Sequence, residues 1–387
     1  MKRTGAVIFH PPAGPSDIER MVASAREASA CDLVESLKTL VPTTIVACSK
    51  DSTAVFESLG ASVHPVADTE PFHFGETLQH IIRSHELDAV VYFGSGSGTL
   101  LSQDQLADIA RFAQRDQNHA LFNNYYSCDF AVMSDTTFLL QLPLPGTDNG
   151  LGFLLSDHGV KCFSLPRSLA SQFDLDTPID LCLLKEANRG GSRLQSFLAS
   201  QPLDHPNIRE TTALLIERTA LVYLVGRVNP ATWQTFEQQV ACRTAGMIEG
   251  RGMKAYANRQ HAVLATLFQK RRFADFFHAL ENSADAAIID SRPLLARKGV
   301  LPAAHERFSC DLFRISEMAD PLWIDFAQRA RDSSIPILLG GHSLVSGGLY
   351  LLSELCWKGR NLPRRLHPDP YEGDGSQHEP VFRQMHP

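Results

Sequence analysis

A short glycine-rich loop, Gly94-Ser-Gly-Ser-Gly98, combines residue types that suit contact with a ligand. Its glycines leave the backbone bare, so a ligand can approach closely, and its two hydroxyls can donate and accept hydrogen bonds. The loop follows the apolar segment 89–93, which is typical of a buried strand. It is therefore expected at the carboxyl edge of a sheet, where open α/β folds bind ligands. A tight strand-to-helix turn is the alternative. The candidate contacts are Gly94, Ser95, Gly96, Ser97 and Gly98.

Cationic or imidazole side chains follow four predicted strands in the second half of the chain: Arg227, Arg251, Arg292 and His342. Parallel strands present their carboxyl ends together, so these side chains should converge on one pocket. Guanidinium groups offer a planar fork of donors that suits carboxylates and phosphates. Glu249 and Asp290 can neutralise at most two of the arginines. We therefore expect a pocket that binds a small anion; ordinary surface charge is the alternative.

The composition limits the classes of protein to consider. Hydrophobic residues make up 44% of the 387 residues and charged residues 20%, which is typical of a globular protein. The net charge of −7 argues against binding to nucleic acid. No apolar run approaches the length of a membrane span, and the first apolar stretch is too short for a signal peptide. Eight cysteines are scattered without a CxxC pair, mostly in apolar segments. These features predict buried thiols and a cytoplasmic protein.

Strands and helices are expected to alternate along most of the chain. In the first half the predicted strands are 5–9, 44–48, 62–66 and 89–93, and the predicted helices are 17–40, 52–59, 75–84 and 103–114. In the second half the predicted strands are 220–225, 245–249, 286–290 and 336–339, and the predicted helices lie near 230–241, 258–281, 320–332 and 346–357. This alternation predicts an α/β protein with a mainly parallel, three-layer sheet domain followed by a second α/β domain.

The pattern loosens around residues 186–212, which are polar and contain proline. We therefore expect a first domain over 1–187, a linker over 188–212 and a second domain over 213–358. Residues 359–387 contain many prolines and few apolar residues, which predicts an extended or disordered tail.

Three segments of the first half, 89–101, 145–151 and 173–181, carry a family resemblance. The third contains Asp-Leu-Asp-Thr-Pro-Ile-Asp-Leu and is the most specific. In this order they resemble the nucleotidyltransferase (GT-A-like) fold of the molybdenum-cofactor and 2-phospholactate guanylyltransferases, over about residues 1–187. The resemblance implies that the loop after the first strand binds nucleotide phosphates. Gly14 and Arg20 are the candidate contacts there, beside a helix N-terminus that can itself hold a phosphate.

The resemblance also implies Mg²⁺, held by an Asp of the middle loop. This chain has no carboxylate between Asp88 and Asp104. Other carboxylates must then serve, because Mg²⁺ takes one or two carboxylates together with phosphate oxygens and water. The candidate metal ligands are Asp129, Asp174 and Asp176, and the candidate catalytic residues are Asp148 and Asp176. Capping of the helix that begins at Thr177–Pro178 is the alternative for Asp176, and a turn is the alternative for Asp148.

The resemblance implies transfer of a nucleotidyl group from a nucleoside triphosphate to a small phosphorylated or carboxylated metabolite. The second domain would hold the acceptor or regulate the reaction. The missing middle-loop carboxylate leaves open a non-catalytic protein that binds a nucleotide or metabolite on the same fold. A nucleotide-sugar glycosyltransferase is the third alternative, because related folds bind nucleotide sugars.

Overall fold

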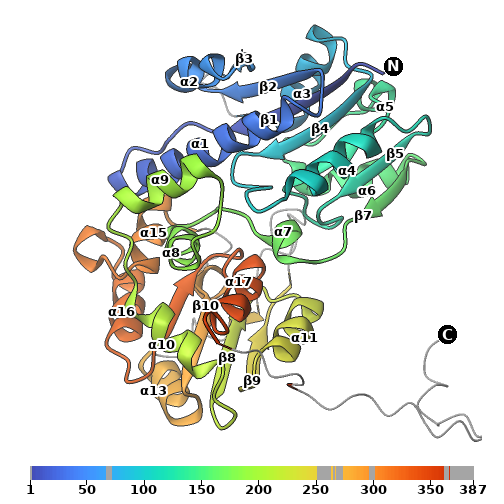
Figure 1. The fold of residues 1–387 in the computed structure, drawn as a ribbon. Coiled ribbons are helices and arrows are strands. Elements are labelled where there is room, and N and C mark those ends of the chain that lie inside the picture. The colour runs from blue at the N-terminus through green and yellow to red at the C-terminus, as the bar shows by residue number, and fades with distance from the viewer. Residues whose placement is uncertain are drawn as a thin grey trace, which may run out of the picture.

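The protein contains a mainly parallel sheet and a fully parallel sheet (Figure 1). Helices cover both faces of each sheet. The fold is that of a computed structural model, which describes residues 2–66, 72–250, 273–295 and 301–360, together with 263, 264, 266 and 366. No described helix is long and apolar enough to cross a membrane.

The first sheet has seven strands in the order β3-β2-β1-β4-β6-β5-β7. The strands are β1 (Thr4–His10), β2 (Thr43–Cys48), β3 (Ser62–Pro65), β4 (Ala89–Gly94), β5 (His119–Phe122), β6 (Phe130–Met133) and β7 (Lys161–Ser164). All pairs are parallel except those of β6, which runs antiparallel to β4 and β5. All seven residues of β1 are buried, as expected for a central strand covered on both faces.

Helices cover this sheet on both faces. One face packs against α1 (Asp17–Leu37), α2 (Thr53–Ser58) and α4 (Gln103–Ala113). The other packs against α3 (Phe74–Ser84), α5 (Thr137–Gln141) and α6 (Leu151–Asp157). Short 3₁₀ turns, η1 (Lys50–Ser52) and η2 (Asp148–Gly150), precede α2 and α6.

The second sheet has four strands, all parallel, in the order β11-β10-β8-β9. They are β8 (Leu221–Gly226), β9 (Arg243–Ile248), β10 (Ala286–Asp290) and β11 (Ile337–Gly340). One face packs against α8 (Pro178–Ala187), α10 (Pro206–Leu214), α11 (Pro230–Gln239) and α17 (Gly347–Leu355). The other packs against α13 (Phe273–Ser283), α14 (Ser291–Leu295), α15 (Ala304–Asp311) and α16 (Pro321–Arg331). The turn η3 (Ile315–Glu317) precedes α16.

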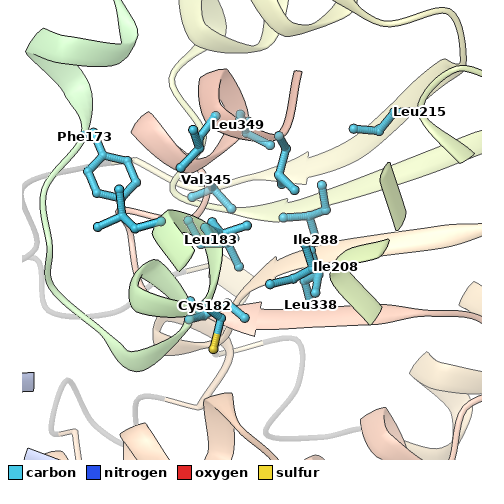
Figure 2. Close-up of a cluster of buried hydrophobic side chains, with 14 of the residues drawn as sticks. Phe173, Cys182, Leu183, Ile208, Leu215, Ile288, Leu338, Val345 and Leu349 are labelled. Carbon is cyan, nitrogen blue, oxygen red and sulfur yellow. The ribbon is translucent and has the colours of Figure 1, made fainter. Parts of the chain in front are cut away.

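The segment between the sheets belongs to the core of the second one. Helix α7 (Leu169–Gln172) ends the first half, and Phe173 and Leu183 then belong to one buried cluster with Ile288 of β10 and Leu338 of β11 (Figure 2). Helix α9 (Ser192–Ser200) packs along α1 and contributes two buried leucines to the same cluster. The expected linker, residues 188–212, thus contains α9 and most of α10, and both helices are packed against the rest of the protein. The division into domains stays a prediction.

The fold class and the eight expected strands are confirmed, each within about two residues of its predicted ends. The helix expected over 17–40 begins behind Ser16 in a capping box with Glu19 and ends at Leu37. The helix expected at 258–281 falls partly outside the described residues, and α13 covers its end. Nearly all of the expected extended tail also lies outside the described residues.

Candidate nucleotide site

The order of strands puts a switch point between β1 and β4. From β1 the chain moves outward to β2 and β3, then returns to place β4 on the other side of β1. The carboxyl ends of β1 and β4 therefore lead into loops that diverge, which is where open α/β sheets bind ligands. His10 ends β1, and the glycine-rich loop Gly94–Gly98 begins at the end of β4.

Protein backbone, rather than open space, surrounds much of the glycine-rich loop. Gly94 N donates to Asp129 O at 3.0 Å, and Leu175 N donates to Gly96 O at 3.0 Å. A methyl group added at Gly96 would lie 2.5 Å from Leu175 O, so this position has no room for a side chain. The loop thus lies directly against the segment Asp174–Asp176, as the resemblance implies. Ligand contact at the loop stays a prediction.

The two serines of the loop differ in their hydrogen bonding. Ser97 Oγ donates to Gly94 O at 2.8 Å and to Asp129 O at 3.0 Å, so it fixes the loop. Ser95 is 3% exposed, and its Oγ has no hydrogen-bond partner among the described residues. The neighbouring His10 is also buried, and its Nδ1 likewise has no partner there. Such groups are costly to leave unpaired, so a water molecule or a ligand atom is needed at this point.

His10 is neutral at physiological pH. Burial, assisted by the charge of Arg26, lowers the pKa of its imidazole to about 4. Its Nε2 lies 3.8 Å from Glu27 Oε2, which suits a tautomer with the proton on Nε2. Nδ1 would then accept a hydrogen bond from a donor at the edge of the sheet.

Carboxylates gather beside the loop. Burial, followed by the charges of Asp129 and Asp176, raises the pKa of Asp174 well above its ordinary value, and Arg26 opposes this shift. Asp129 accepts a hydrogen bond at Oδ2 from Asn123 Nδ2 at 2.9 Å. Asp148 lies in η2, and its backbone oxygen accepts from Cys128 Sγ at 3.2 Å. The structure therefore brings Asp129 and Asp174 together at the same edge as the glycine-rich loop.

This carboxylate pair fits a divalent cation. Burial and the charge of Asp129 disfavour the charged form of Asp174, and a bound cation would offset both effects. Among the described residues no group of three or more His, Cys, Asp or Glu side chains could hold a metal. Two carboxylates are still enough for Mg²⁺ when phosphate oxygens and water complete its coordination. Asp129 and Asp174 are therefore the residues that would hold it.

Asp176 does not cap helix α8. Thr177 is the N-cap, and Asp180 completes the capping box by accepting from Thr177 N at 2.7 Å and from Asp176 N at 3.0 Å. Burial raises the pKa of Asp180 to about 7. Asp176 instead accepts from Arg26 Nη2 at 2.7 Å, and Arg26 Nε also donates to Leu175 O at 2.8 Å. Capping, the alternative expectation for Asp176, is therefore wrong.

The loop after β1 already holds a carboxylate where a phosphate was expected. Glu19 Oε2 accepts from Ser16 N at 3.1 Å and from Ser16 Oγ at 2.7 Å, at the N-terminus of α1. A methyl group at Gly14 would collide with Glu19. The guanidinium of Arg20 donates to Pro15 O in the same loop and to Asp17. Phosphate binding by Gly14 and Arg20 stays a prediction, and Glu19 would have to move to permit it.

The carboxyl edge of the second sheet carries the expected arginines in ion pairs. Arg227 Nε donates to Asp290 Oδ2 at 2.6 Å. Arg292, 5% exposed, makes two bonds to Asp311, Nη1 to Oδ1 at 2.5 Å and Nη2 to Oδ2 at 2.6 Å. Burial alone would lower the pKa of Arg292, but the charge of Asp311 raises it on balance.

These pairs alter the argument for an anion site. The sequence pointed to two acidic partners; the structure uses Asp290 and adds Asp311, which the sequence pattern did not reveal. Glu249 instead accepts hydrogen bonds from backbone N–H groups of Gly250 and Leu264, at 3.2 and 3.1 Å. The charges of Arg227 and Arg292 are therefore already balanced by carboxylates, and no bound anion is needed to balance them. Arg251 lies outside the described residues.

Residues 173–180 contact the loop after β4 of the first sheet and the carboxyl end of β11 in the second. Ser343, in the loop after β11, donates a hydrogen bond to Asp174 O. A methyl group at Gly341 would lie 2.9 Å from Thr177 Cγ2. The residues on either side of His342, Gly341 and Ser343, therefore both contact this segment. The segment Asp174–Leu175 therefore lies between two loops. The glycine-rich loop of the first sheet contacts one side of it, and the His342 loop of the second sheet contacts the other.

Arg307 of α15 is a cation at this junction that the sequence did not single out. Its Nε is buried and has no hydrogen-bond partner among the described residues. Burial, followed by the nearby charge of Arg292, lowers its pKa, while Asp176 and Glu19 act in the opposite direction. Since it lies on a helix between unrelated loops, no spacing or motif could have identified it.

A cavity of about 690 Å³ opens beside the far end of the glycine-rich loop. Its lining includes Gly98 and Thr99, Ser29 and Asp32 of α1, and Arg189. Asp32 accepts from the N–H groups at the start of α9, and Arg189 pairs with Glu354 at 2.6 Å. The size suits a small ligand, and the charges along its wall are already compensated.

No family model matches the chain, and no curated protein matches it. Among solved structures, a candidate nucleotide-diphospho-sugar transferase from Desulfovibrio desulfuricans G20 aligns with a TM-score of 0.38 and 13% identity, over 51% of this chain and 95% of its own. A cytidylyltransferase from Leptospira borgpetersenii gives 0.36 and 13%, over 53% and 100%. A nucleotidyl transferase from Methanothermobacter thermautotroptrophicus gives 0.33 and 16%, over 44% and 90%. These neighbours are nucleotidyltransferase-like proteins, and the likeness extends over about half of this chain.

Proposed function

We propose that the protein transfers a nucleotidyl group from a nucleoside triphosphate to a small anionic metabolite. The triphosphate would bind at the carboxyl edge of the first sheet, between β1 and β4. The observation that carries the proposal is the junction of the glycine-rich loop with the carboxylates of Asp129 and Asp174, fixed by the bonds from Gly94 N to Asp129 O and from Leu175 N to Gly96 O. The resemblance to guanylyltransferases makes GTP the first nucleotide to test.

Each residue of this edge has a task in the proposed reaction. Asp129 and Asp174 would hold Mg²⁺, which neutralises triphosphate charge and favours in-line displacement at phosphorus. Arg26, held by Leu175 O and Asp176, supplies fixed positive charge beside the carboxylates. Ser95 Oγ and His10 Nδ1 would hydrogen-bond polar atoms of the nucleotide, since neither has a partner among the described residues.

The acceptor would approach from the second sheet. Arg307 supports this assignment, because its buried Nε lacks a partner among the described residues and because it lies near Asp176. A phosphate or carboxylate of the acceptor would pair with this guanidinium. We retain His342 as a further candidate contact, since its loop meets the Asp174–Asp176 segment through Ser343. Arg227 and Arg292 would organise the loops through their carboxylate partners.

A non-catalytic protein that binds the nucleotide or the metabolite is the second candidate. One observation favours binding of the metabolite alone: the carboxylate of Glu19 occupies the N-terminus of α1 and is bonded to Ser16. An anion already fixed there opposes the close approach of triphosphate oxygens.

The test measures binding and turnover separately. Titration calorimetry with GTP, CTP and ATP, each with and without Mg²⁺, reports binding. Release of pyrophosphate in the presence of small phosphorylated and carboxylated acids reports transfer. We expect Mg²⁺-dependent binding and acceptor-dependent release of pyrophosphate. Binding without Mg²⁺ and without release would favour the second candidate, and absence of any nucleotide binding would refute both nucleotide functions.

Asp174→Asn is the decisive variant. The substitution keeps the shape of the side chain and removes a charge whose formation burial opposes, so the fold should persist. Mg²⁺-dependent turnover should fall by at least about 100-fold, the scale of removing a group that stabilises transition-state charge. Asp157→Asn, at an exposed position at the end of α6, is the matched control and should leave turnover unchanged.

A further inference from the structure

The loop between β5 and β6, residues 123–129, exposes an aromatic ring three residues before Asp129. Tyr126 is 62% exposed, although its loop neighbours Asn124 and Cys128 are buried. Binding residues are often found on loops that a rigid scaffold positions, so the surroundings of this ring decide whether it can serve a ligand.

A rigid base supports the ring of Tyr126. Its centroid lies 5.3 Å from that of Tyr125 and 5.7 Å from that of Phe153, and Tyr125 and Phe153 are 5.1 Å apart. Gly152 of α6 lets the helix approach closely, because a methyl group there would lie 2.5 Å from Tyr125 O. The three rings therefore form a fixed aromatic cluster, with Tyr126 as its exposed member.

Hydrogen bonds fix the loop on both sides of Tyr126. The N–H of Tyr126 donates to Asn124 Oδ1 at 3.2 Å. Ser127 Oγ is bonded to Asn149 Oδ1, and Cys128 Sγ donates to Asp148 O at 3.2 Å. The loop is thus joined to η2, and the aromatic ring has little conformational freedom left to lose when a ligand binds.

The ring lies within reach of the carboxylate pair. Tyr126 precedes Asp129 by three residues, so their Cα atoms can be at most about 11 Å apart. The backbone oxygen of Asp129 accepts from Gly94 N and Ser97 Oγ, which joins this loop to the glycine-rich loop. A nucleoside triphosphate with its phosphates at Asp129 can extend its base over this distance.

We propose that Tyr126 is the stacking platform for the base of the nucleotide, with Tyr125 and Phe153 as its support. This inference rests on the proposed function and adds the residue that binds the base. Every base offers a flat π-face, so the platform contributes affinity without selecting one base strongly. Selection among bases would come from polar groups near the ring of Tyr126. Asn149 and Asp148 are candidates, because both are hydrogen-bonded to the loop that carries Tyr126.

The test compares a ligand that has a base with one that lacks it. Binding of Mg²⁺–GTP and of Mg²⁺–tripolyphosphate is measured by calorimetry for the full chain and for Tyr126→Ala, Tyr126→Phe and Val55→Ala. Val55 is an exposed apolar residue of α2 and serves as the control. Tyr126→Ala should weaken GTP about 10- to 100-fold, the scale of one base–aromatic stack, and leave tripolyphosphate unchanged. Tyr126→Phe keeps the ring and should retain affinity for GTP, as should Val55→Ala.

The outcomes separate the two proposals. If the unaltered chain binds GTP and tripolyphosphate equally, or if Tyr126→Ala binds GTP as the unaltered chain does, the stacking role is refuted and the proposed function stands. An equal loss for both ligands in Tyr126→Ala would also refute stacking, since it indicates damage to the loop. If the unaltered chain binds neither ligand, the proposed function fails and the stacking role fails with it.

Discussion

Replacing Asp311 by Asn should destabilise the second sheet strongly. Asp311 is fully buried and binds Arg292 through both carboxylate oxygens. Arg292 Nη1 also donates to Ser291 Oγ at 2.7 Å and to Gly340 O at 3.2 Å, so the pair joins α15 to the ends of β10 and β11. The substitution leaves a buried guanidinium without its counter-charge.

The expected loss is about 3–5 kcal/mol, the measured scale for breaking a buried ion pair by removing one partner. For a cooperative unit of 150–250 residues this corresponds to a fall in Tm of about 6–20 °C. Replacing both residues by apolar ones, Arg292→Met with Asp311→Leu, removes the unpaired charge and should recover most of the loss. The pair thus matters chiefly because neither member is tolerated alone.

Urea unfolding followed by tryptophan fluorescence measures this effect, because Trp323 is buried in the core on that face of the second sheet. Asp325→Asn, which breaks an exposed pair with Arg329 on α16, is the control and should leave the midpoint unchanged. A loss below about 1 kcal/mol for Asp311→Asn would show that Arg292 is solvated or finds another partner. Arg292 would then again be available for the anion site that the sequence suggested.

Three further predictions concern other positions. Because the pKa of His10 is lowered to about 4, below its unfolded value of 6.5, the folded protein binds fewer protons between these pH values. His10 should therefore contribute up to about 3 kcal/mol to the free energy of unfolding as the pH rises from 4 to 6.5. The difference in stability between the unaltered chain and His10→Asn, followed in urea titrations, should change by this amount over that range; a constant difference would contradict the assignment. Gly347→Ala places a methyl group 2.2 Å from Phe173 Cα and should lower stability by about 1–3 kcal/mol, whereas Gly150→Ala, with nothing within 4 Å, should be near neutral in the same assay. Asp32→Ala removes the side chain that accepts from the first N–H groups of α9 and should cost about 0.5–2 kcal/mol; unchanged hydrogen exchange in α9 would argue against this role.

Much of the fold was predictable because its central strands are apolar and its first helices carry local signals. Segments 5–9 and 286–290 are continuous apolar runs, and Ser16 with Glu19 forms the capping box that precedes α1. Strands β5, β6 and β7 were not predicted, and each has only four residues. Length alone does not explain this, because β3 and β11 are equally short and were predicted. The antiparallel placement of β6 depends on its pairing with β4 and β5, which local sequence does not encode.

The candidate site was predictable only where a motif of the resembled family marks the residues. The glycine-rich loop and the Asp174–Asp176 segment were expected at one place, and the structure brings them into hydrogen-bond contact. The partners Arg26 and Asp311 were not expected, since each comes from a helix with no distinguishing motif. Such pairings depend on how helices pack across the junction between the sheets, which local spacing does not encode.

The order of synthesis gives helix α8 an unusual position. The strands of the first sheet are complete at Ser164, so that sheet can form soon after it leaves the ribosome. The apolar face of α8, including Leu181 and Leu183, packs against strands that end only at Gly340. During translation of the residues between, this helix has emerged but the last of its strand partners has not yet been made. The nascent chain therefore carries this leucine-rich helix without its strands while the residues from Asn188 to Gly340 are made, which makes α8 a point of contact for a chaperone and of misassembly when translation stalls.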